Sequence, residues 1–161
     1  MENNELIKYN AGSLQKVGYI VNITNKLFSV NLKTLHILYL DDHYPVSTAV
    51  SQCIGKKFPN ASWRFIQDGD SALLYVKNCF DNGKPLDLII TDIMHPGLNG
   101  VDFANAVREN EQNHNGKIPI LFLSLIDTKS ILQEIEEIAF CKYLNLNSNC
   151  EEINLAIQNL V

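Results

Sequence analysis

Four polar residues in this sequence follow short apolar runs, and their side chains could together carry out phosphoryl chemistry. Asp41 and Asp42 end one run, Asp92 ends a second and Ser124 ends a third. Three carboxylates gathered in one place repel one another, so such a cluster makes physical sense around a hard divalent cation. Magnesium takes oxygen ligands, and it would orient an incoming phosphoryl group towards a carboxylate nucleophile. A role as turn former or helix cap explains any one aspartate well, but it explains all three together poorly.

These runs belong to a regular alternation of strand-like and helix-like segments that begins at residue 35. The expected strands are residues 35–40, 62–66, 86–91, 118–123 and 141–146, and the expected helices are residues 46–57, 71–80, 100–111, 128–138 and 151–160. The alternation predicts an α/β fold, a doubly wound five-stranded parallel sheet with helices on both faces. In such a sheet ligands bind beyond the carboxyl ends of the strands, where all four polar residues stand. Asp70 is the expected N-cap of the second helix.

Residues 1–34 stand apart and are expected to form an N-terminal extension to a domain that spans residues 35–161. Apolar and polar residues alternate along residues 19–32, which favours a two-stranded hairpin turning near Asn25-Lys26. A rival interpretation places the apolar residues on one helical stripe, but Gly18 and the β-branched residues weaken a helix. Either apolar face must be buried, so the extension is expected to pack on the domain or to form a homodimer contact by strand addition.

The composition narrows the class of protein. Hydrophobic residues make up 46% of the 161 residues and charged residues 19%, a balance typical of one globular domain. The net charge of −5 argues against direct nucleic-acid binding, which needs clustered Lys and Arg. The start lacks the basic residues of a signal peptide, and no apolar run approaches the ~20 residues that span a bilayer, so a cytoplasmic location without membrane attachment is expected. The four cysteines, Cys53, Cys79, Cys141 and Cys150, are expected to be reduced thiols.

The segment Leu-Ile-Ile-Thr-Asp-Ile-Met-His-Pro-Gly-Leu-Asn-Gly, residues 88–100, resembles the phosphoacceptor loop of the response-regulator receiver domains of two-component signalling. Asp92 matches the phosphorylated aspartate of that family, and Pro96 and Gly100 match its loop proline and glycine. Tyr-Leu-Asp-Asp, residues 39–42, resembles the acidic pair of the family.

Two further residues fit the same family pattern. Ser124 matches the switch hydroxyl, and Tyr143 matches the switch aromatic residue at the family's usual distance along the chain. The resemblance covers residues 35–161 and implies the flavodoxin-like receiver fold. It also implies that Ser124 donates a hydrogen bond to the phosphoryl group and that Tyr143 turns inward when Ser124 moves. A face between residues 128 and 157 would then carry the signal to a downstream protein target.

The resemblance implies a magnesium site as well. The ligands would be Asp42, Asp92 and the backbone carbonyl of Met94, with Asp41 supporting the ion through water. Asp92 would accept a phosphoryl group from a histidine kinase or a phosphotransfer protein. Two histidines flank this site, His43 and His95, and both are expected to face solvent.

Two positions depart from the family pattern. Receivers normally carry a lysine three residues after the switch aromatic, followed by proline, and here Leu146 and Asn147 occupy these positions. Leucine cannot pair with phosphoryl oxygens as an ammonium group does, so charge stabilisation is expected to fall. Lys142 lies four residues before Leu146, so both side chains are expected on the same face of the strand but apart along it. Leu125 replaces a residue that is usually small, and it is expected to narrow the mouth of the site.

Three classes of function are therefore weighed. The first is a stand-alone receiver that is phosphorylated on Asp92 and alters a protein-binding face. The second is a pseudo-receiver, a phosphorylation-independent protein-interaction module, which Leu125 and Leu146 favour and the acidic residues and Ser124 oppose. The third is a phosphatase with an aspartyl-phosphate intermediate. Such enzymes place a second aspartate two residues after the nucleophile as acid–base, and Met94 stands there, so an enzyme is not expected.

Overall fold

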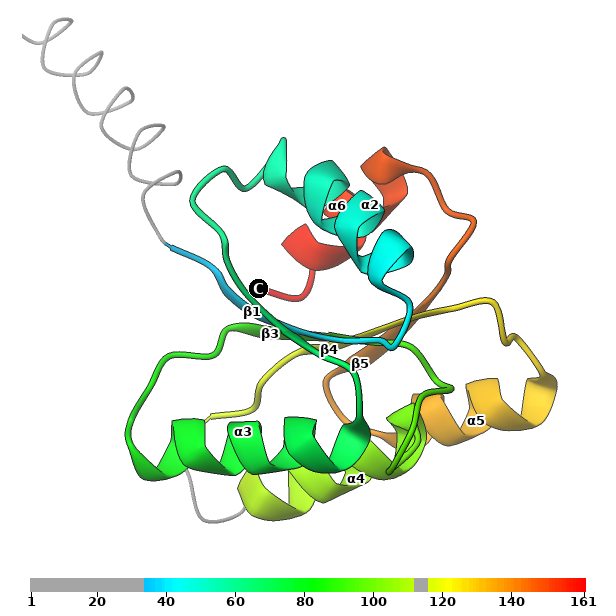
Figure 1. The fold of residues 1–161 in the computed structure, drawn as a ribbon. Helices are drawn as coiled ribbons and strands as arrows, with labels where there is room; N and C mark the ends of the chain where they lie inside the picture. Colours follow the sequence, from blue (N-terminus) through cyan, green and yellow to red (C-terminus); the bar gives the residue numbers. More distant parts are fainter. Residues whose placement is uncertain (1–33, 112–115) are drawn as a thin grey trace, which may run out of the picture. The chain divides into compact units, whose positions relative to one another are not determined.

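The computed structural model describes residues 34–111 and 116–161, in which strands and helices alternate (Figure 1). The strands are β1 His36–Leu40, β2 Ser62–Ile66, β3 Leu88–Thr91, β4 Ile120–Ser124 and β5 Cys141–Asn145. The helices are α2 Tyr44–Gly55, α3 Gly69–Asp81, α4 Gly100–Glu111, α5 Lys129–Glu137 and α6 Cys150–Gln158. The predicted hairpin or helix of residues 1–34 concerns a segment that, apart from Thr34, lies outside the described residues.

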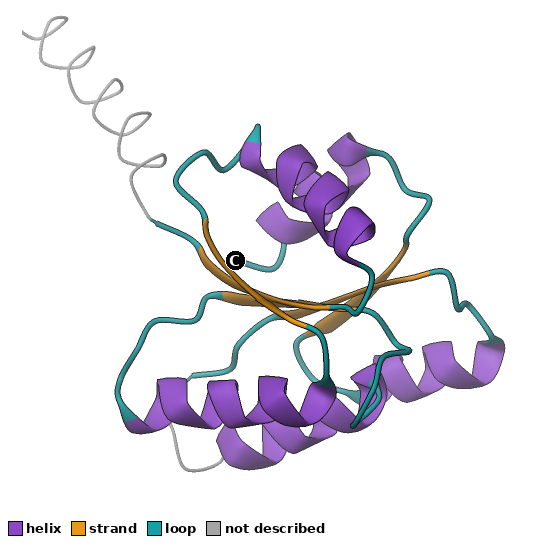
Figure 2. Ribbon diagram, viewed as in Figure 1, coloured by secondary structure: helices purple, strands orange, loops and turns teal. Residues whose placement is uncertain are grey.

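All five strands pair in parallel in one sheet, in the order β2-β1-β3-β4-β5. Helices α2 and α6 cover one face, and α3, α4 and α5 cover the other (Figures 1 and 2). The predicted doubly wound α/β architecture is therefore confirmed. The chain leaves β1 towards β2 on one side and returns to β3 on the other, which creates the switch point at which such sheets bind ligands.

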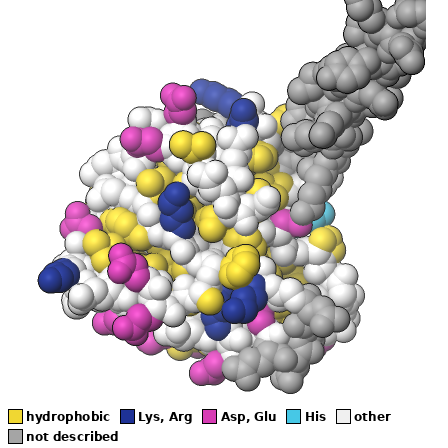
Figure 3. Space-filling view, turned by 180° about the vertical axis from the view of Figure 1, so that it is seen from behind, with side chains coloured by type: hydrophobic (Ala, Val, Ile, Leu, Met, Phe, Trp, Pro, Cys, Tyr) yellow, Lys and Arg dark blue, Asp and Glu magenta, His cyan; other side chains and the backbone are white. Residues whose placement is uncertain are grey.

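Each face of the sheet has its own hydrophobic core. Leu38 and Phe122 are fully buried on the side of α3, α4 and α5, and Tyr39 and Leu121 are buried on the side of α2 and α6. Strands β3 and β4 are buried along their whole length, as parallel strands covered on both faces must be. No helix in residues 34–111 or 116–161 is both long enough and apolar enough to cross a bilayer. On the face drawn in Figure 3, acidic and basic side chains are interspersed.

Side chains define where two of the helices begin. The Asp68 carboxylate accepts a hydrogen bond from the Ser71 backbone N–H at 2.8 Å, so Asp68 caps α3. The prediction of Asp70 as this cap is wrong, because α3 starts two residues earlier and Asp70 lies in its first turn. At α6 the Asn149 side chain accepts from the Glu152 N–H at 3.0 Å, and Glu152 accepts from the Asn149 N–H at 3.0 Å. This reciprocal capping box fixes the start of α6.

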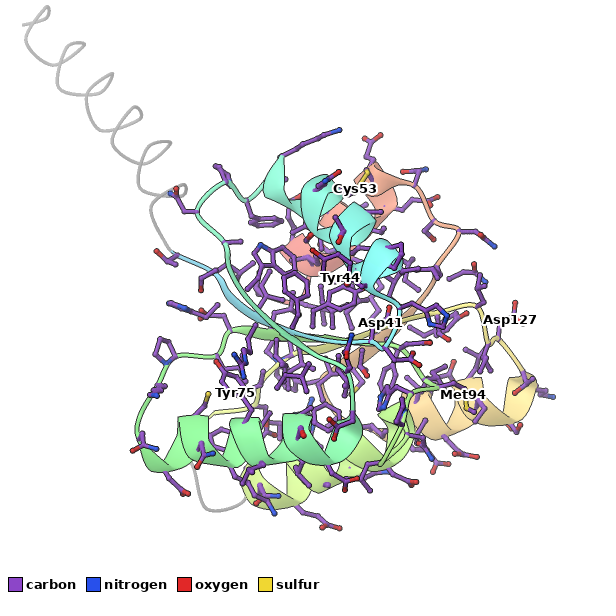
Figure 4. The ribbon with its side chains drawn as sticks, in the orientation of Figure 1. Asp41, Tyr44, Cys53, Tyr75, Met94 and Asp127 are labelled. Carbon is purple, nitrogen blue, oxygen red and sulfur yellow. A yellow bond between two sulfur atoms is a disulfide. The ribbon has the colours of Figure 1, made fainter. Side chains whose placement is uncertain are left out.

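The expectation of four reduced thiols is wrong for two of them. Cys53 in α2 and Cys150 at the start of α6 are joined by a disulfide, with their Cα atoms 5.5 Å apart (Figure 4). Cys79 and Cys141 are free. The bonded residues stand 97 positions apart in sequence, so no local spacing predicts the pair. Only the packing of α6 beside α2 brings them together.

Candidate functional site at the carboxyl edge of the sheet

A small cavity of about 190 Å³ opens at the carboxyl ends of the central strands. Its walls are formed by Asp41, His43, Val46, Asp92, Ser124, Leu125, Ile126 and Leu146. Three predicted site residues, from three different strand ends, therefore meet at one cavity. The other predicted residues, Asp42, Met94 and Tyr143, do not line this cavity.

Asp41 is the buried carboxylate of the site. Its side chain is 5% exposed, and its Oδ1 accepts a hydrogen bond from the His43 backbone N–H at 2.7 Å. Burial raises the pKa of Asp41 above its ordinary value, and the charge of Asp92 adds to this rise, while the bond from His43 opposes it. A buried carboxylate beside a second carboxylate favours a cation between them.

Tyr39 is a residue of the site that sequence reasoning missed. The ring is 1% exposed, and the pKa of its hydroxyl is strongly raised by burial and further by Asp41 and Asp92. The Tyr39 hydroxyl therefore interacts with the Asp41 side chain. Side chains two apart on a strand share a face, so the spacing of Tyr39 and Asp41 was a signal that could have found this contact.

Asp42 and His43 extend the acidic cluster to the surface. Ligand atoms of Asp41, Asp42 and His43 lie within 4.8 Å of one another. The His43 ring is exposed, as expected, and its Nδ1 lies 3.2 Å from Asp42 Oδ1. Carboxylate oxygens suit magnesium better than an imidazole does, so the two aspartates are the better magnesium ligands of this group. His95 is only half-buried, and its Nε2 lies 3.3 Å from the Thr91 hydroxyl.

Asp92 is held in place by the backbone around it. Its N–H donates to the Leu40 carbonyl at 3.0 Å, and its Oδ1 accepts from the Ile93 N–H at 2.7 Å. The Gly100 N–H donates to the Ile93 carbonyl at 2.8 Å, which folds the start of α4 against the end of β3. A Cβ atom at Gly100 would collide with the Asp92 carbonyl oxygen. This close approach explains why a glycine stands eight residues after the aspartate.

The loop between Asp92 and α4 turns sharply and presents Met94 at the surface. The Met94 side chain is 61% exposed, and Figure 4 shows it near the same edge of the sheet as Asp41 and Asp127. Gly97 has a φ of +76°, a conformation that favours glycine. The Pro96 carbonyl accepts a hydrogen bond from the backbone N–H of α3 at its first residue, at 2.9 Å, and this bond anchors the loop.

Ser124 and Tyr143 are in direct contact. Ser124 is 1% exposed, and its hydroxyl oxygen accepts a hydrogen bond from the Ile126 N–H at 3.2 Å. The Tyr143 hydroxyl donates to the Ser124 backbone carbonyl at 3.1 Å. Burial raises the pKa of Tyr143, and Asp127 and Asp92 raise it further. The two positions are thus linked in space as well as by sequence pattern.

Leu146 lies where its side chain can reach the cavity. Its N–H donates to the Ser124 carbonyl at 2.9 Å, which extends the pairing of β4 and β5 by one residue and places the side chain in the cavity wall beside Val46. Lys142 pairs in register with Leu121 and is exposed away from this wall. Among the described residues, no lysine or arginine lines the cavity. Leu125 stands at its rim and is 57% exposed.

The family model of the response regulator receiver domain matches residues 37–158. The chain belongs to this family. The receiver resemblance of the sequence is thereby confirmed, and with it membership of two-component signalling proteins. A search of curated protein sequences finds no match.

Solved receiver structures share the fold. The chemotaxis response regulator CheY4 of Vibrio cholerae matches with a TM-score of 0.65 and 22% identity, covering 80% of this chain and 100% of CheY4. The receiver domain of the histidine kinase CKI1 from Arabidopsis thaliana, complexed with Mg2+ and BeF3-, matches with a TM-score of 0.66 and 18% identity, covering 78% and 90%. The receiver domain of NarL from Mycobacterium tuberculosis matches with a TM-score of 0.63 and 23% identity, covering 79% of this chain and 95% of that domain. These similarities establish the fold of this receiver.

Proposed function

We propose that this receiver accepts a phosphoryl group on Asp92 from a histidine kinase or a phosphotransfer protein, and that it answers by changing a protein-binding face. One observation carries the proposal. Asp41, Asp92 and Ser124 come from three separate strand ends and meet at one cavity of about 190 Å³. A fold that preserved only packing would not need buried and half-buried polar side chains at this position.

The side chains have complementary parts in the transfer. An Asp92 carboxylate oxygen attacks phosphorus, a new O–P bond forms, and the bond from phosphorus to the donor atom breaks. The Ser124 hydroxyl donates a hydrogen bond to a phosphoryl oxygen. Its own oxygen is held by the Ile126 N–H, so its proton is free to point towards that group. Asp42 remains at the surface side of the cavity, beside the path by which a donor approaches.

The donor set fits magnesium, which would supply positive charge for the phosphoryl oxygens. We assign its ligands to Asp42, Asp92 and the Met94 carbonyl, with Asp41 acting through water. The buried Asp41 carboxylate has a raised pKa and no lysine or arginine beside it in the described cavity, so a cation there relieves the repulsion. The related CKI1 receiver, solved with Mg2+ and BeF3-, supports this proposal.

The output would pass through Tyr143 to a downstream protein. The Tyr143 hydroxyl is bonded to Ser124 at the site, and its strand β5 lies between α5 and α6 in sequence. A shift of Ser124 towards a phosphoryl group would break or move this bond. The face formed by residues 128–157 would then change the side chains that it presents.

One observation favours a second candidate function, a pseudo-receiver that binds its partner regardless of phosphorylation. Leu146 lines the cavity where the family carries a lysine, so no lysine or arginine of the described residues is there to pair with the phosphoryl group. A phosphatase is not proposed, because exposed Met94 offers no acid–base group two residues after Asp92.

Intact mass measurement tests the proposal. The full chain is incubated with magnesium and acetyl phosphate, a small phosphodonor. One phosphoryl group is expected on the wild type and none on Asp92→Asn. Asp81→Asn, which alters an exposed carboxylate at the end of α3, is the matched control and should label normally. Labelling that survives in Asp92→Asn would refute the assignment of the acceptor.

A further inference from the structure

The disulfide between Cys53 and Cys150 joins the two helices that cover one face of the sheet. Cys53 is 5% exposed within α2, whereas Cys150 is the first residue of α6 and is exposed. Their Cα atoms are 5.5 Å apart, a separation at which two cysteines can bond without backbone movement. Neither residue lines the cavity at Asp92.

The two cysteines lie at a surface cavity that charged side chains also line. Cys150 is the first residue of α6, and the Asn149 side chain caps this turn, which also carries Glu151 and Glu152. Lys56 and Lys57 line the same surface cavity as the two cysteines, and Glu151 is the acidic residue that opposes them there. Cys150 is exposed and so accessible to an oxidant, and the Cys53 sulfur beside it can act as the resolving group.

Helix α2 and the loop that leads into α6 each supply one residue that lines the site at Asp92. Val46 in the first turns of α2 lines that cavity, and Leu146 lines it from the loop that leads into α6. Leu146 stands four residues before Cys150, and its N–H is bonded to the Ser124 carbonyl. A covalent bond between α2 and α6 therefore limits how far these two lining residues can separate.

We propose that Cys53 and Cys150 form a reversible redox site whose oxidation restrains the phosphoryl cavity and slows transfer to Asp92. This inference rests on the proposed function, because it concerns regulation of the same cavity. The reduced chain has two thiols here, so α2 and the loop before α6 can separate to admit the donor. The oxidised chain holds them together.

The oxidant is hydrogen peroxide, and each step balances. The Cys150 thiolate attacks one peroxide oxygen, an S–O bond forms, the O–O bond breaks, and the departing oxygen leaves as water after taking a proton. The Cys53 sulfur then attacks the Cys150 sulfur, the S–O bond breaks, and a second water leaves with the Cys53 proton. In total two thiols lose two electrons and two protons, and hydrogen peroxide becomes two waters. Exchange with an external dithiol reverses the reaction, because Cys150 is accessible.

Thiol counting on the full chain tests the site itself. The reduced protein should show four reactive thiols after denaturation, and hydrogen peroxide at low concentration should leave two. Cys150→Ser should form no intramolecular disulfide, while Cys141→Ser, which removes a free cysteine, should form it normally. Dithiothreitol should restore the thiols under native conditions. A pair that fails to form, or that resists excess dithiothreitol in the folded protein, would overturn the proposal.

The coupling to Asp92 is tested with acetyl phosphate and, separately, by amide NMR. Labelling should be about fivefold slower in the oxidised wild type than in the reduced wild type. The difference should vanish in Cys150→Ser. Equal slowing by peroxide in that variant would place the effect at another cysteine and would overturn the proposal. If neither state labels, the proposed function fails, and the redox inference is then decided by the Leu146 and Ser124 amide shifts. Identical shifts in the two redox states would overturn it.

Discussion

The Tyr143 hydroxyl donates a hydrogen bond, 3.1 Å long, to the backbone carbonyl oxygen of Ser124. The same carbonyl accepts the Leu146 N–H at 2.9 Å. One carbonyl group at the end of β4 thus joins the aromatic ring on one side of the sheet to the residue that fills the cavity wall on the other. Any displacement of Ser124 towards a phosphoryl group must therefore alter both bonds.

Replacing Tyr143 by phenylalanine should uncouple this contact while preserving the site. The variant loses one part-buried hydrogen bond, so its free energy of unfolding should fall by about 0.5–1.5 kcal/mol. Labelling of Asp92 should continue, but the accompanying amide shifts along β5 and α5 should shrink. Urea unfolding and NMR measure the two effects. Tyr44→Phe, at a ring that is 68% exposed, serves as the control and should change neither. Undiminished shifts in Tyr143→Phe would contradict the proposed output route.

Removing the charge of Asp41 should stabilise the magnesium-free protein at neutral pH. Its pKa is raised in the folded state, so the folded protein holds this proton more tightly than the unfolded chain does. The resulting stabilisation is present below the unfolded pKa and is lost as pH rises through the folded pKa. Asparagine does not ionise, so Asp41→Asn does not lose stability as the pH rises. At pH 7 the free energy of unfolding of the variant should be higher than that of the wild type by on the order of 1 kcal/mol. That corresponds to about 2–4 °C in Tm.

The greater stability of Asp41→Asn should disappear on acidification, and the difference from the wild type should become smaller when magnesium is added. Urea titrations near pH 4 and pH 7, with and without magnesium, give the comparison. If the wild type is as stable as the variant or more stable at pH 7 without magnesium, then groups within the protein already compensate the charge of the buried carboxylate.

Magnesium should bind weakly at Asp42 and Asp92. Titration should shift the amide resonances of the residues after β1 and β3, because carboxylate oxygens from both strand ends would contact the ion. The shifts should be lost in a double variant, Asp42→Ala with Asp92→Ala. Asp81→Ala should retain them. Shifts that persist unchanged in the double variant would remove magnesium from this site.

The sequence predicts the sheet, and the meeting of polar residues at its carboxyl edge, because both depend on local patterns. Apolar runs fix β3 and β4, and polar residues at strand ends of a parallel sheet must share one edge, so Asp41, Asp92 and Ser124 were predicted as neighbours. The Cys53–Cys150 pair was not, because it depends on the angle and offset at which α2 and α6 pack. No periodicity along one segment carries that information.

Smaller errors have equally local causes. Two aspartates stand near the start of α3, and the choice of cap depended on a single bond from Ser71 to Asp68. Strands β1 and β3 are one and two residues shorter at their starts than the apolar runs suggest, because Leu35 and Leu86 pack on the cores without strand pairing of their own. A residue can be buried without pairing in a strand, and the hydrophobic pattern of a sequence indicates burial alone.

Residues 1–34 should contribute more than a tail. Their apolar alternation needs a buried surface, so we expect the full chain either to be more stable than residues 35–161 alone or to form a homodimer that the shorter chain does not. Residues Thr34–Val161 form a compact unit, so the comparison is practicable. Light scattering gives the mass and thermal melting the stability. Equal mass and equal melting temperature in both chains would refute the expectation.

The decisive prediction concerns Leu146, because it separates an active switch from a pseudo-receiver. Its side chain lies in the cavity wall beside the proposed phosphoryl position, and no described lysine or arginine lines that cavity. Losing a well-placed ion contact costs about 2–4 kcal/mol of transition-state stabilisation. Each 1.36 kcal/mol is about tenfold, so transfer should be roughly a hundredfold slower than in a receiver with the lysine.

Leu146→Lys should therefore speed acetyl phosphate labelling and enlarge the NMR response around Tyr143, and it should do so only while Asp92 is present. The half-buried position of Leu146 at the end of β5 leaves room for a lysine stem along the wall with its ammonium group in the cavity. Lys142→Ala on the wild-type background is the matched control for a compensating cation and should leave the rate unchanged. If the wild type already labels as fast as a receiver that carries the lysine, Lys142 reaches the site after all, and Lys142→Ala will show it. If Leu146→Lys binds magnesium, keeps its fold and still does not label, phosphorylation is not the function of this receiver, and its partner recognises the unmodified surface.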